Sequence, residues 1–202
     1  MPDKFKNKYR TESARLQNWD YRSKAKYFVT ICTKNRECFF GKIRNGEMLL
    51  NDVGKIVESE WVKTFELRPD MNLCMGEYIV MPNHFHGIIG IGDNRYNSIS
   101  GSNRDGRDEM HRVSTVTTTT NGNNLRTKPP KNQFGPQSKN LGSIIRGFKS
   151  GVTVGARLIN PDFGWQDRFH DHIIRDKKSF QRISEYIKNN PRNWSDDGFN
   201  DK

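Results

Sequence analysis

Cysteine is scarce in this sequence, which has three in 202 residues. Cys32, Cys38 and Cys74 form no CxxC pair, and an odd number of cysteines fits neither a disulfide framework nor a zinc cage. We therefore expect reduced thiols and assign them no chemistry.

Long apolar runs are also missing, and the longest are far too short to span a bilayer. The first ten residues, MPDKFKNKYR, are basic and polar with no apolar stretch behind them, so they do not predict a signal peptide. We expect a cytoplasmic protein without a membrane partner. Hydrophobic residues make up only 33% of the chain but aromatic residues 11%, which predicts a compact core beside sizeable solvated segments.

Negative charge is the third shortage, because 23 acidic residues face 34 basic ones and the formal net charge is +11. Such a balance favours a polyanionic partner, and nucleic acid is the commonest one for a cytosolic protein. A merely soluble basic surface is the alternative, and charge alone does not separate the two. The length predicts one domain over residues 1–202.

Hydrophobic periodicity and turn signals predict the elements along the chain. In order, they are a strand at 26–34, a hairpin at 38–50, a helix at 51–69, strands at 72–80 and 84–91, a helix at 138–153, a short strand within 165–176 and a helix at 176–191. Asn45-Gly46 is a strong two-residue turn signal in the hairpin. A basic N-terminal arm at 1–25 and a polar, flexible insertion at 92–135 complete the organisation.

This order of elements indicates an α+β fold. We expect a ferredoxin-like antiparallel sheet with helices packed on one side. The first long strand, 26–34, and the third, 84–91, should form the central pair. The run GIIGI in the third strand is apolar on both alternations, which predicts that this strand is covered on both faces.

Two histidines stand at the start of this central strand. Side chains two apart in a strand project from the same face, so His84 and His86 can point at one ion while Phe85 packs behind them. Gly87 removes a side chain beside them, which lets a ligand backbone come close. The alternative is two hydrogen-bonded histidines on a half-exposed strand, without a metal.

Two imidazoles need a further ligand to complete a metal site. The candidates elsewhere are His170, Asp171, His172, Asn189 and Asn190. On the final helix, Tyr186 lies at the edge of the apolar stripe and Asn190 lies one turn further along the same face, so a phenol and an amide can face one point. The alternative for Tyr186 is an ordinary half-buried helical tyrosine.

Two blocks of the sequence carry a family resemblance. YIVMPNHFHGII resembles the His-hydrophobe-His motif of the HUH transposases. WQDRFHDHIIRDKKSFQRISEYIKNNP resembles the carboxyl-terminal block of their REP-associated tyrosine transposase branch. With the first strand, the resemblance covers most of the chain outside the N-terminal arm and the insertion, and the insertion itself departs from the compact family pattern.

The resemblance implies a single-tyrosine enzyme that cuts and rejoins single-stranded DNA next to hairpins, acting as a monomer or homodimer. It matches His84 and His86 to the metal-binding pair and Tyr186 to the nucleophile. It places Asn190 where an amide, commonly glutamine in related transposases, completes the metal site.

The chemistry suits these residue types. A protonated phenol, with a pKa near ~10, is a poor nucleophile, and a divalent ion that withdraws charge from the scissile phosphate lowers the barrier to attack. Attack would give a 5′-phosphotyrosine and a free 3′-hydroxyl, so rejoining needs no nucleotide cofactor, in agreement with the lack of a GxxxxGK[ST] loop. A mixed nitrogen and oxygen ligand set favours Mg or Mn, with zinc open from ligand type.

Several other residues are candidates for contacts with DNA. His170 and His172 can bind phosphate, support the metal site from outside its ligands, or simply cap the strand. Trp165, Arg168 and Phe169 combine aromatic surface with a cation, which suits stacking of unpaired bases and gripping of phosphates, although Trp165 can equally be core. Three cations on the second long helix can line a DNA groove or be a solvated face: Lys139, Arg146 and Lys149.

Two rival functions remain open from the sequence. One is a DNA or RNA binding protein that keeps the fold and the basic surface but has lost turnover. The other is a hydrolase that uses a metal-activated water, for which the tyrosine would be dispensable.

Overall fold

The structure is a computed structural model, which describes residue 16 and residues 19–98 and 138–200. Most of the predicted arm at 1–25 lies outside these ranges. The part of the predicted insertion at 92–135 that follows residue 98 also lies outside them. Within the arm, Trp19 and Tyr21 pack against the hydrophobic core. The strands are β1 (Ala25–Cys32), β2 (Gly41–Arg44), β3 (Glu47–Leu50), β4 (Leu73–Val80), β5 (His84–Ile91) and β6 (His170–Ile174). The helices are α1 (Asp52–Glu66), α2 (Leu141–Ile159) and α3 (Lys177–Asn189), with short 3-10 helices η2 (Lys34–Arg36), η3 (Pro69–Met71) and η5 (Asn190–Asp196).

Four strands form an antiparallel sheet in the order β4-β5-β1-β6. The central pair is β1 and β5, as the sequence predicts. Every residue of β5 is buried, which confirms that this strand is covered on both faces. The prediction of an α+β fold with an antiparallel sheet and helices packed on it is therefore confirmed.

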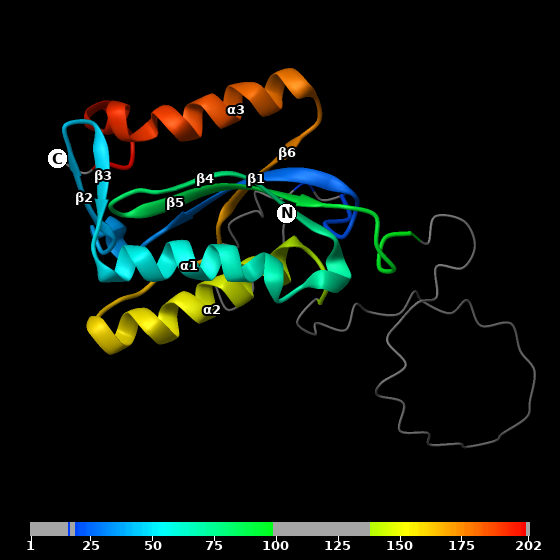
Figure 1. Ribbon diagram of the computed structural model, residues 1–202, viewed down its shortest axis with the longest axis horizontal. Helices are drawn as coiled ribbons and strands as arrows, with labels where there is room; N and C mark the ends of the chain where they lie inside the picture. The colour runs from blue at the N-terminus through cyan, green and yellow to red at the C-terminus, as the bar shows by residue number, and fades with distance from the viewer. Residues whose placement is uncertain (1–15, 17–18, 99–137, 201–202) are drawn as a thin grey trace, which may run out of the picture.

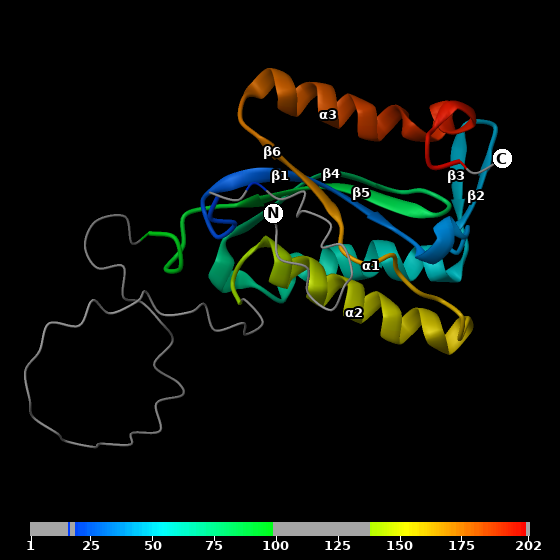
Figure 2. The same cartoon turned by 180° about the vertical axis from the view of Figure 1, so that it is seen from behind.

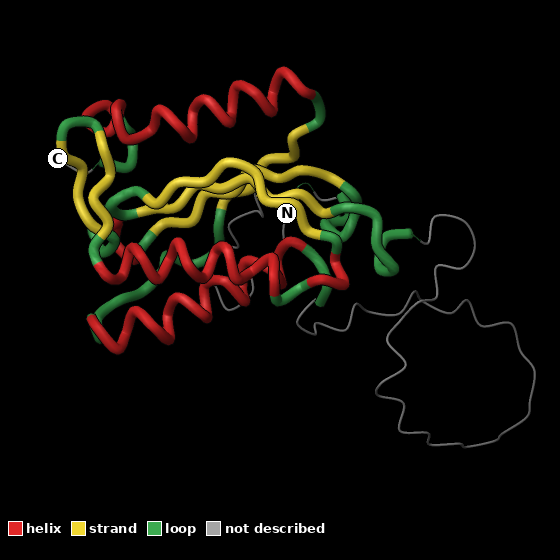
Figure 3. The backbone as a smooth tube through the Cα atoms, in the orientation of Figure 1, coloured by secondary structure: helices red, strands yellow, loops and turns green. Residues whose placement is uncertain are grey.

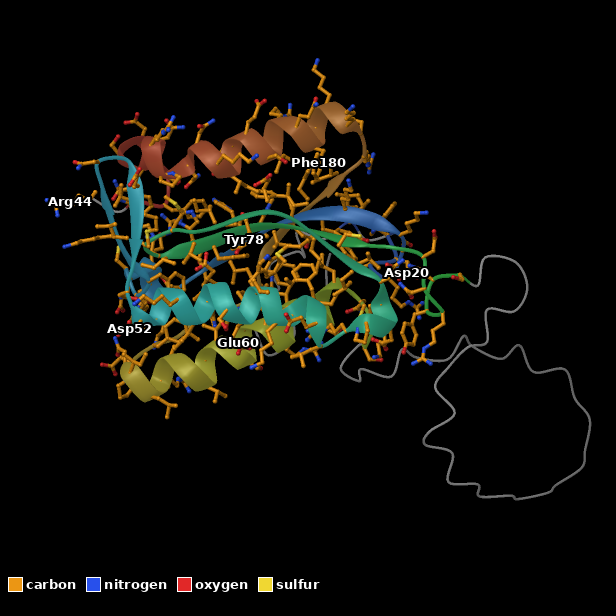
Figure 4. All side chains as sticks on the ribbon, viewed as in Figure 1. Asp20, Arg44, Asp52, Glu60, Tyr78 and Phe180 are labelled. Atoms are coloured by element: carbon orange, nitrogen blue, oxygen red, sulfur yellow. The ribbon has the colours of Figure 1, made fainter. Side chains whose placement is uncertain are left out.

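The helices lie on both sides of the sheet, so the prediction of helices on one side is wrong. Figures 1 and 3 show α1 and α2 below the sheet and α3 above it. The reason is that β5 alternates apolar residues toward both faces, and each face needs cover. On the upper face, Ile187, Ile183 and Phe180 of α3 pack with Ile88 and Phe28 of the sheet, and Figure 4 shows Phe180 beneath its helix.

The lower face carries the larger core, which is centred on aromatic side chains. Trp61 of α1 is fully buried, and its ring centroid lies 4.7 Å from that of Phe85 in β5 and 5.3 Å from that of Phe148 in α2. Rings at these separations add to the stabilisation from buried area. This core fixes β5 from below, and so sets the direction of the side chains that alternate with Phe85.

The β2–β3 hairpin forms at the predicted turn. Asn45 and Gly46 have φ values of 54° and 75°, and positive φ at both central residues is the signature of the type I′ turn that Asn-Gly favours. After the hairpin, the Asn51 side chain accepts a hydrogen bond of 2.9 Å from the Gly54 amide and so caps α1. Within the described ranges, no helix combines the length and the apolar character needed to cross a membrane.

Close packing at the start of α1 gives a stability prediction. A methyl group at Gly54 would collide with the Phe40 carbonyl oxygen, which cannot move easily because it accepts a hydrogen bond from the Asn51 amide. We expect Gly54→Ala to lower the free energy of unfolding by about 1–3 kcal/mol, although helix propensity alone favours alanine by about 1 kcal/mol. Urea unfolding measures the change, with Gly198→Ala as the control because a methyl there meets nothing within 4 Å. Stabilisation by Gly54→Ala would contradict the packing.

Candidate active site

The two histidines of β5 lie side by side on the upper face of the sheet. His84 and His86 are 0% and 1% exposed, and their ring centroids are 4.5 Å apart. They project toward the α3 side because their neighbour Phe85 points into the lower core. The strand alternation that the sequence predicts therefore brings both imidazoles to one place.

Hydrogen bonds fix the orientation of the His84 ring. The Asn83 amide nitrogen donates to the Arg36 and Phe199 carbonyl oxygens, at 3.0 Å and 2.7 Å, so its carbonyl oxygen Oδ1 is left as an acceptor. That oxygen lies 2.9 Å from His84 Nδ1. Nδ1 must therefore carry the proton, and Nε2 of His84 keeps a lone pair.

The His86 ring is held between β1 and α3. Its Nδ1 lies 2.9 Å from the Thr30 hydroxyl, and its Nε2 lies 3.3 Å from the Tyr186 hydroxyl. If Nδ1 donates to Thr30, the lone pair on Nε2 can accept the phenol proton or bind a metal ion. Each histidine then keeps a lone pair on Nε2 while its Nδ1 is held by a hydrogen bond, which is the pattern typical of metal-binding histidines.

Asn190 supplies a third acceptor at this place. It follows α3 directly and keeps helical φ and ψ of −55° and −43°, although it precedes Pro191. Its side chain is buried, and its amide acts on the Tyr186 phenol, whose pKa it lowers. The amide therefore lies near the phenol, one helical turn along the chain, and that the two face one point stays a prediction.

Buried acceptors without partners test whether the site fits a metal ion. Among the described residues, neither His84 Nε2 nor Asn190 Oδ1 has a hydrogen-bond partner, although both atoms are buried. Orphaned buried acceptors are rare, and two of them beside His86 Nε2 fit a divalent cation with mixed nitrogen and oxygen ligands. The described residues contain no metal-binding group of three His, Cys, Asp or Glu, so the amide is an essential member of this candidate set.

Burial keeps both imidazoles neutral. It lowers the pKa of His84 to about 3, with the Arg36 charge acting in the same direction. Burial also holds the pKa of His86 well below 6.5, and the charge interaction with His84 lowers that pKa further. Neutral imidazole is the form that binds metal ions.

The lowered histidine pKa values predict acid sensitivity. Below about pH 6.5 both histidines bind a proton in the unfolded chain but not in the folded chain. Their contribution to the free energy of unfolding is therefore fully present above that pH and is lost as the pH falls toward 3. Between about pH 7.5 and about pH 4.5, in the presence of a chelator, we expect His84→Gln to lose about 2 kcal/mol less unfolding free energy than the wild type. Urea unfolding at both pH values measures this. Equal losses would mean that His84 is not held neutral.

Tyr186 lies above the histidine pair on α3. It is 44% exposed, and its ring contacts His86 and the edge of Phe28, with centroids 5.3 Å and 6.1 Å away. Burial, followed by the negative charge of Asp197, raises the pKa of the phenol, while the hydrogen bond from Asn190 lowers it. The net shift is upward, so the phenol is protonated at neutral pH and needs help to act as a nucleophile.

Sequence reasoning missed several residues around this site. Thr30 and Asn83 hold the two Nδ1 atoms, and Phe199 and Trp194 lie against the His84 ring at centroid distances of 4.6 Å and 6.0 Å. Asp197 acts electrostatically on both His86 and Tyr186. The position of Asn83 directly before His84 was an available signal, whereas nothing in the composition of residues 194–199 marks them.

The second histidine pair lies on the same face but at the edge of the sheet. His170 and His172 of β6 are exposed, and neither ring makes a hydrogen bond within the described residues. His170 lies opposite Thr30 in the sheet and influences His86 only through charge. The groups that hydrogen-bond directly to the rings of His86 and His84 are Thr30 and Asn83 instead.

The other DNA-binding candidates lie away from Tyr186. A groove of about 610 Å³ on the α2 side of the sheet is lined by five of them, namely Arg146, Lys149, Trp165, Arg168 and Phe169. The Lys149 ammonium donates to the Gln166 and Arg168 carbonyl oxygens, at 2.8 Å and 3.0 Å, so it also fixes the loop before β6. The sixth candidate, Lys139, lies outside the groove and forms an ion pair of 2.6 Å with Asp70.

Trp165 combines both roles that the sequence leaves open. Its ring packs with Phe40, Phe148 and Phe163 in the core and also lines the groove. The indole nitrogen donates to the Lys149 carbonyl oxygen at 3.1 Å. The structure therefore gathers five candidates in one groove but does not bring them to the face that carries the histidine pair.

Solved structures are similar to this chain in fold. The structure of a REP-associated tyrosine transposase bound to a REP hairpin matches with a TM-score of 0.50 and 16% identity, over 89% of this chain and 74% of that chain. This likeness shows that the two share a fold. A Deinococcus radiodurans protein to which a transposase role is ascribed matches with a TM-score of 0.38 and 12% identity, over 87% of this chain and 95% of that chain, which is too low to support an argument.

Sequence comparison gives a nearer relative. No family model matches the chain. An uncharacterized protein of Haemophilus influenzae is 39% identical over 189 residues, which cover 92% of this chain and 90% of that protein. At this identity and coverage, the chain belongs to the same protein family as the Haemophilus influenzae protein.

Proposed function

We propose that this protein is a metal-dependent HUH-type tyrosine transposase, which cleaves and rejoins single-stranded DNA next to hairpins through Tyr186. The observation that carries the proposal is the meeting of three buried acceptors with one half-exposed phenol. The acceptors are His84 Nε2, His86 Nε2 and Asn190 Oδ1, and the phenol oxygen lies 3.3 Å from the second of them. A protein that only binds nucleic acid has no physical need for this combination.

The residues divide the reaction between them. The Tyr186 oxygen attacks a DNA phosphorus, the bond from phosphorus to the 3′-oxygen breaks, and a 5′-phosphotyrosine forms while the 3′-oxygen leaves as a hydroxyl. Because His86 Nε2 is a proposed metal ligand, the phenol proton passes to solvent, which reaches the half-exposed Tyr186, and the departing 3′-oxygen takes up a proton from solvent. Rejoining is the reverse attack by a 3′-hydroxyl on the phosphotyrosine, so the number of phosphodiester bonds is conserved.

The proposed cofactor is Mg or Mn, held by His84, His86 and Asn190. When bound, such an ion would withdraw charge from the scissile phosphate and stabilise the leaving oxygen. The proposed partner is hairpin DNA with a single-stranded flank. The net charge of +11 and the groove lined by Arg146 and Trp165 support a nucleic acid partner, and the similar transposase was solved with a hairpin bound.

A covalent trapping experiment tests the proposal against its rivals. The full chain is incubated with hairpin DNA labelled at its 3′ end and with Mn, and the products are separated under denaturing conditions. We expect a labelled species that migrates with the protein. Cleavage without such a species would instead indicate hydrolysis by a metal-activated water, and binding without cleavage would indicate an inactive nucleic acid binding protein.

A further inference from the structure

The helix α3 covers one half of the upper sheet face more fully than the other. The helix packs mainly on β4 and β5, and β6 follows β1 on the other side of the sheet, where Figure 2 shows it crossing in front. On the less covered half, His170 and His172 of β6 and Lys26 of β1 are exposed. The Lys26 ammonium lies over the Phe180 ring at 4.3 Å from its centroid.

Strand register connects these histidines to the candidate active site. His170 lies opposite Thr30, and Thr30 lies opposite His86. Directly opposed residues point to the same face, so the three side chains form one row across the sheet. His172 lies opposite Phe28, whose ring edge contacts Tyr186, in the row next to it. Two strand spacings, or about 10 Å, therefore separate His86 from the exposed imidazoles.

Described residues also lie on other sides of the candidate site. The helix α3 itself lies over β4, while Phe199 and Trp194 cover His84. The sheet forms the floor. Over β1 and β6, the exposed histidines lie opposite Thr30 and Phe28, so a DNA strand that reaches Tyr186 across these two strands passes them.

The chemistry of the two side chains suits a phosphodiester. Neither imidazole has a hydrogen-bond partner among the described residues, so each retains an N–H donor. Asn83 and Thr30 already hold the candidate metal ligands, which leaves no such supporting position for His170 or His172. Nearby positive charge from Lys26 favours an anion over a cation here.

We infer that His170 and His172 bind the phosphodiester backbone of the single-stranded flank and thereby position the scissile phosphate at Tyr186. This assignment rests on the proposed function. It makes the pair positioning residues that act on the strand, distinct from the metal ligands and from the groove beside α2.

Neutralising single phosphates tests the inference. The parent is the full chain with Tyr186→Phe, and the probes are hairpin oligonucleotides with oligothymidine flanks, each carrying one methylphosphonate. Binding is followed by fluorescence anisotropy in a chelator. At one or two adjacent flank positions, we expect the neutral linkage to weaken binding to the parent by about tenfold, but to leave binding to a variant that also carries His170→Ala and His172→Ala unchanged. A further variant with His170→Arg and His172→Arg should regain sensitivity at those positions.

Matched controls separate this contact from general effects of charge and folding. Lys55→Ala removes an exposed cation on the lower side and should keep the parent's sensitivity to the methylphosphonates. A stem without flanks should bind the parent and the double alanine variant equally, which shows that the variant is folded. Equal sensitivity of both proteins at every flank position would overturn the inference, as would insensitivity of the parent at all of them.

The outcomes also distinguish this inference from the proposed function. If the wild type forms the covalent species and the histidine variants bind like their parent, the inference alone fails. If the phosphate contact is found but the wild type forms no covalent species, the contact stands as part of a binding protein and the strand transferase proposal fails.

Discussion

Replacing Tyr186 by phenylalanine should abolish the covalent species and reduce DNA cleavage by roughly 10,000-fold or more, because the attacking oxygen itself is removed. The change keeps the aromatic ring that contacts Phe28 and His86, so the fold and the metal ligands should remain in place. Cleavage rate and covalent product are measured on the same labelled hairpin with Mn.

Tyr78→Phe is the matched control. Tyr78 packs in the lower core against Trp61 and Phe85, and its hydroxyl makes no hydrogen bond among the described residues. This variant should keep full cleavage activity. If Tyr186→Phe still cleaves DNA at a rate near that of the wild type, the nucleophile is a water molecule and not the phenol.

Removing one of the buried imidazoles should weaken the proposed binding of a metal ion. We expect His84→Ala to weaken Mn binding by more than about 100-fold, because the loss of a ligand should exceed the 10–100-fold effect that is typical of a lost supporting group. Thr30→Val, which keeps the shape of the side chain but breaks the hydrogen bond to His86 Nδ1, should weaken it by roughly tenfold. Electron paramagnetic resonance of free Mn measures both without DNA.

Histidines at the sheet edge control for general metal affinity. His172 lies on the same face of the sheet as His84, but its ring is exposed. The variant His172→Ala should therefore leave Mn binding unchanged. Equal Mn affinity in His84→Ala and the wild type would show that the orphaned Nε2 and Oδ1 atoms do not serve a metal ion.

Local sequence signals predicted much of the architecture. Helical and strand periodicity and the Asn45-Gly46 turn predicted the elements because each signal acts within a few residues. The central position of β5 followed from its apolar residues on both alternations. The placement of α3 on the opposite face was not predicted, because it depends on which side of the sheet the chain crosses after β6.

The candidate site was predicted where its geometry is local. Period two in a strand aligns His84 with His86, and one helical turn aligns Tyr186 with Asn190. That these two pairs meet is a tertiary fact, and Thr30 and Asp197 join them only through the fold. The separation of the Trp165 groove from Tyr186 has the same origin, because α2 and α3 pack on opposite faces.

Mapping the site of DNA attachment tests the central claim most directly. The trapped protein is digested with protease and nuclease, and tandem mass spectrometry locates the residual nucleotide. The account predicts a 5′-phosphonucleotide on the oxygen of Tyr186, within the peptide that spans α3. Attachment to any other residue, or an intact α3 peptide from protein that has cleaved its DNA, would contradict it.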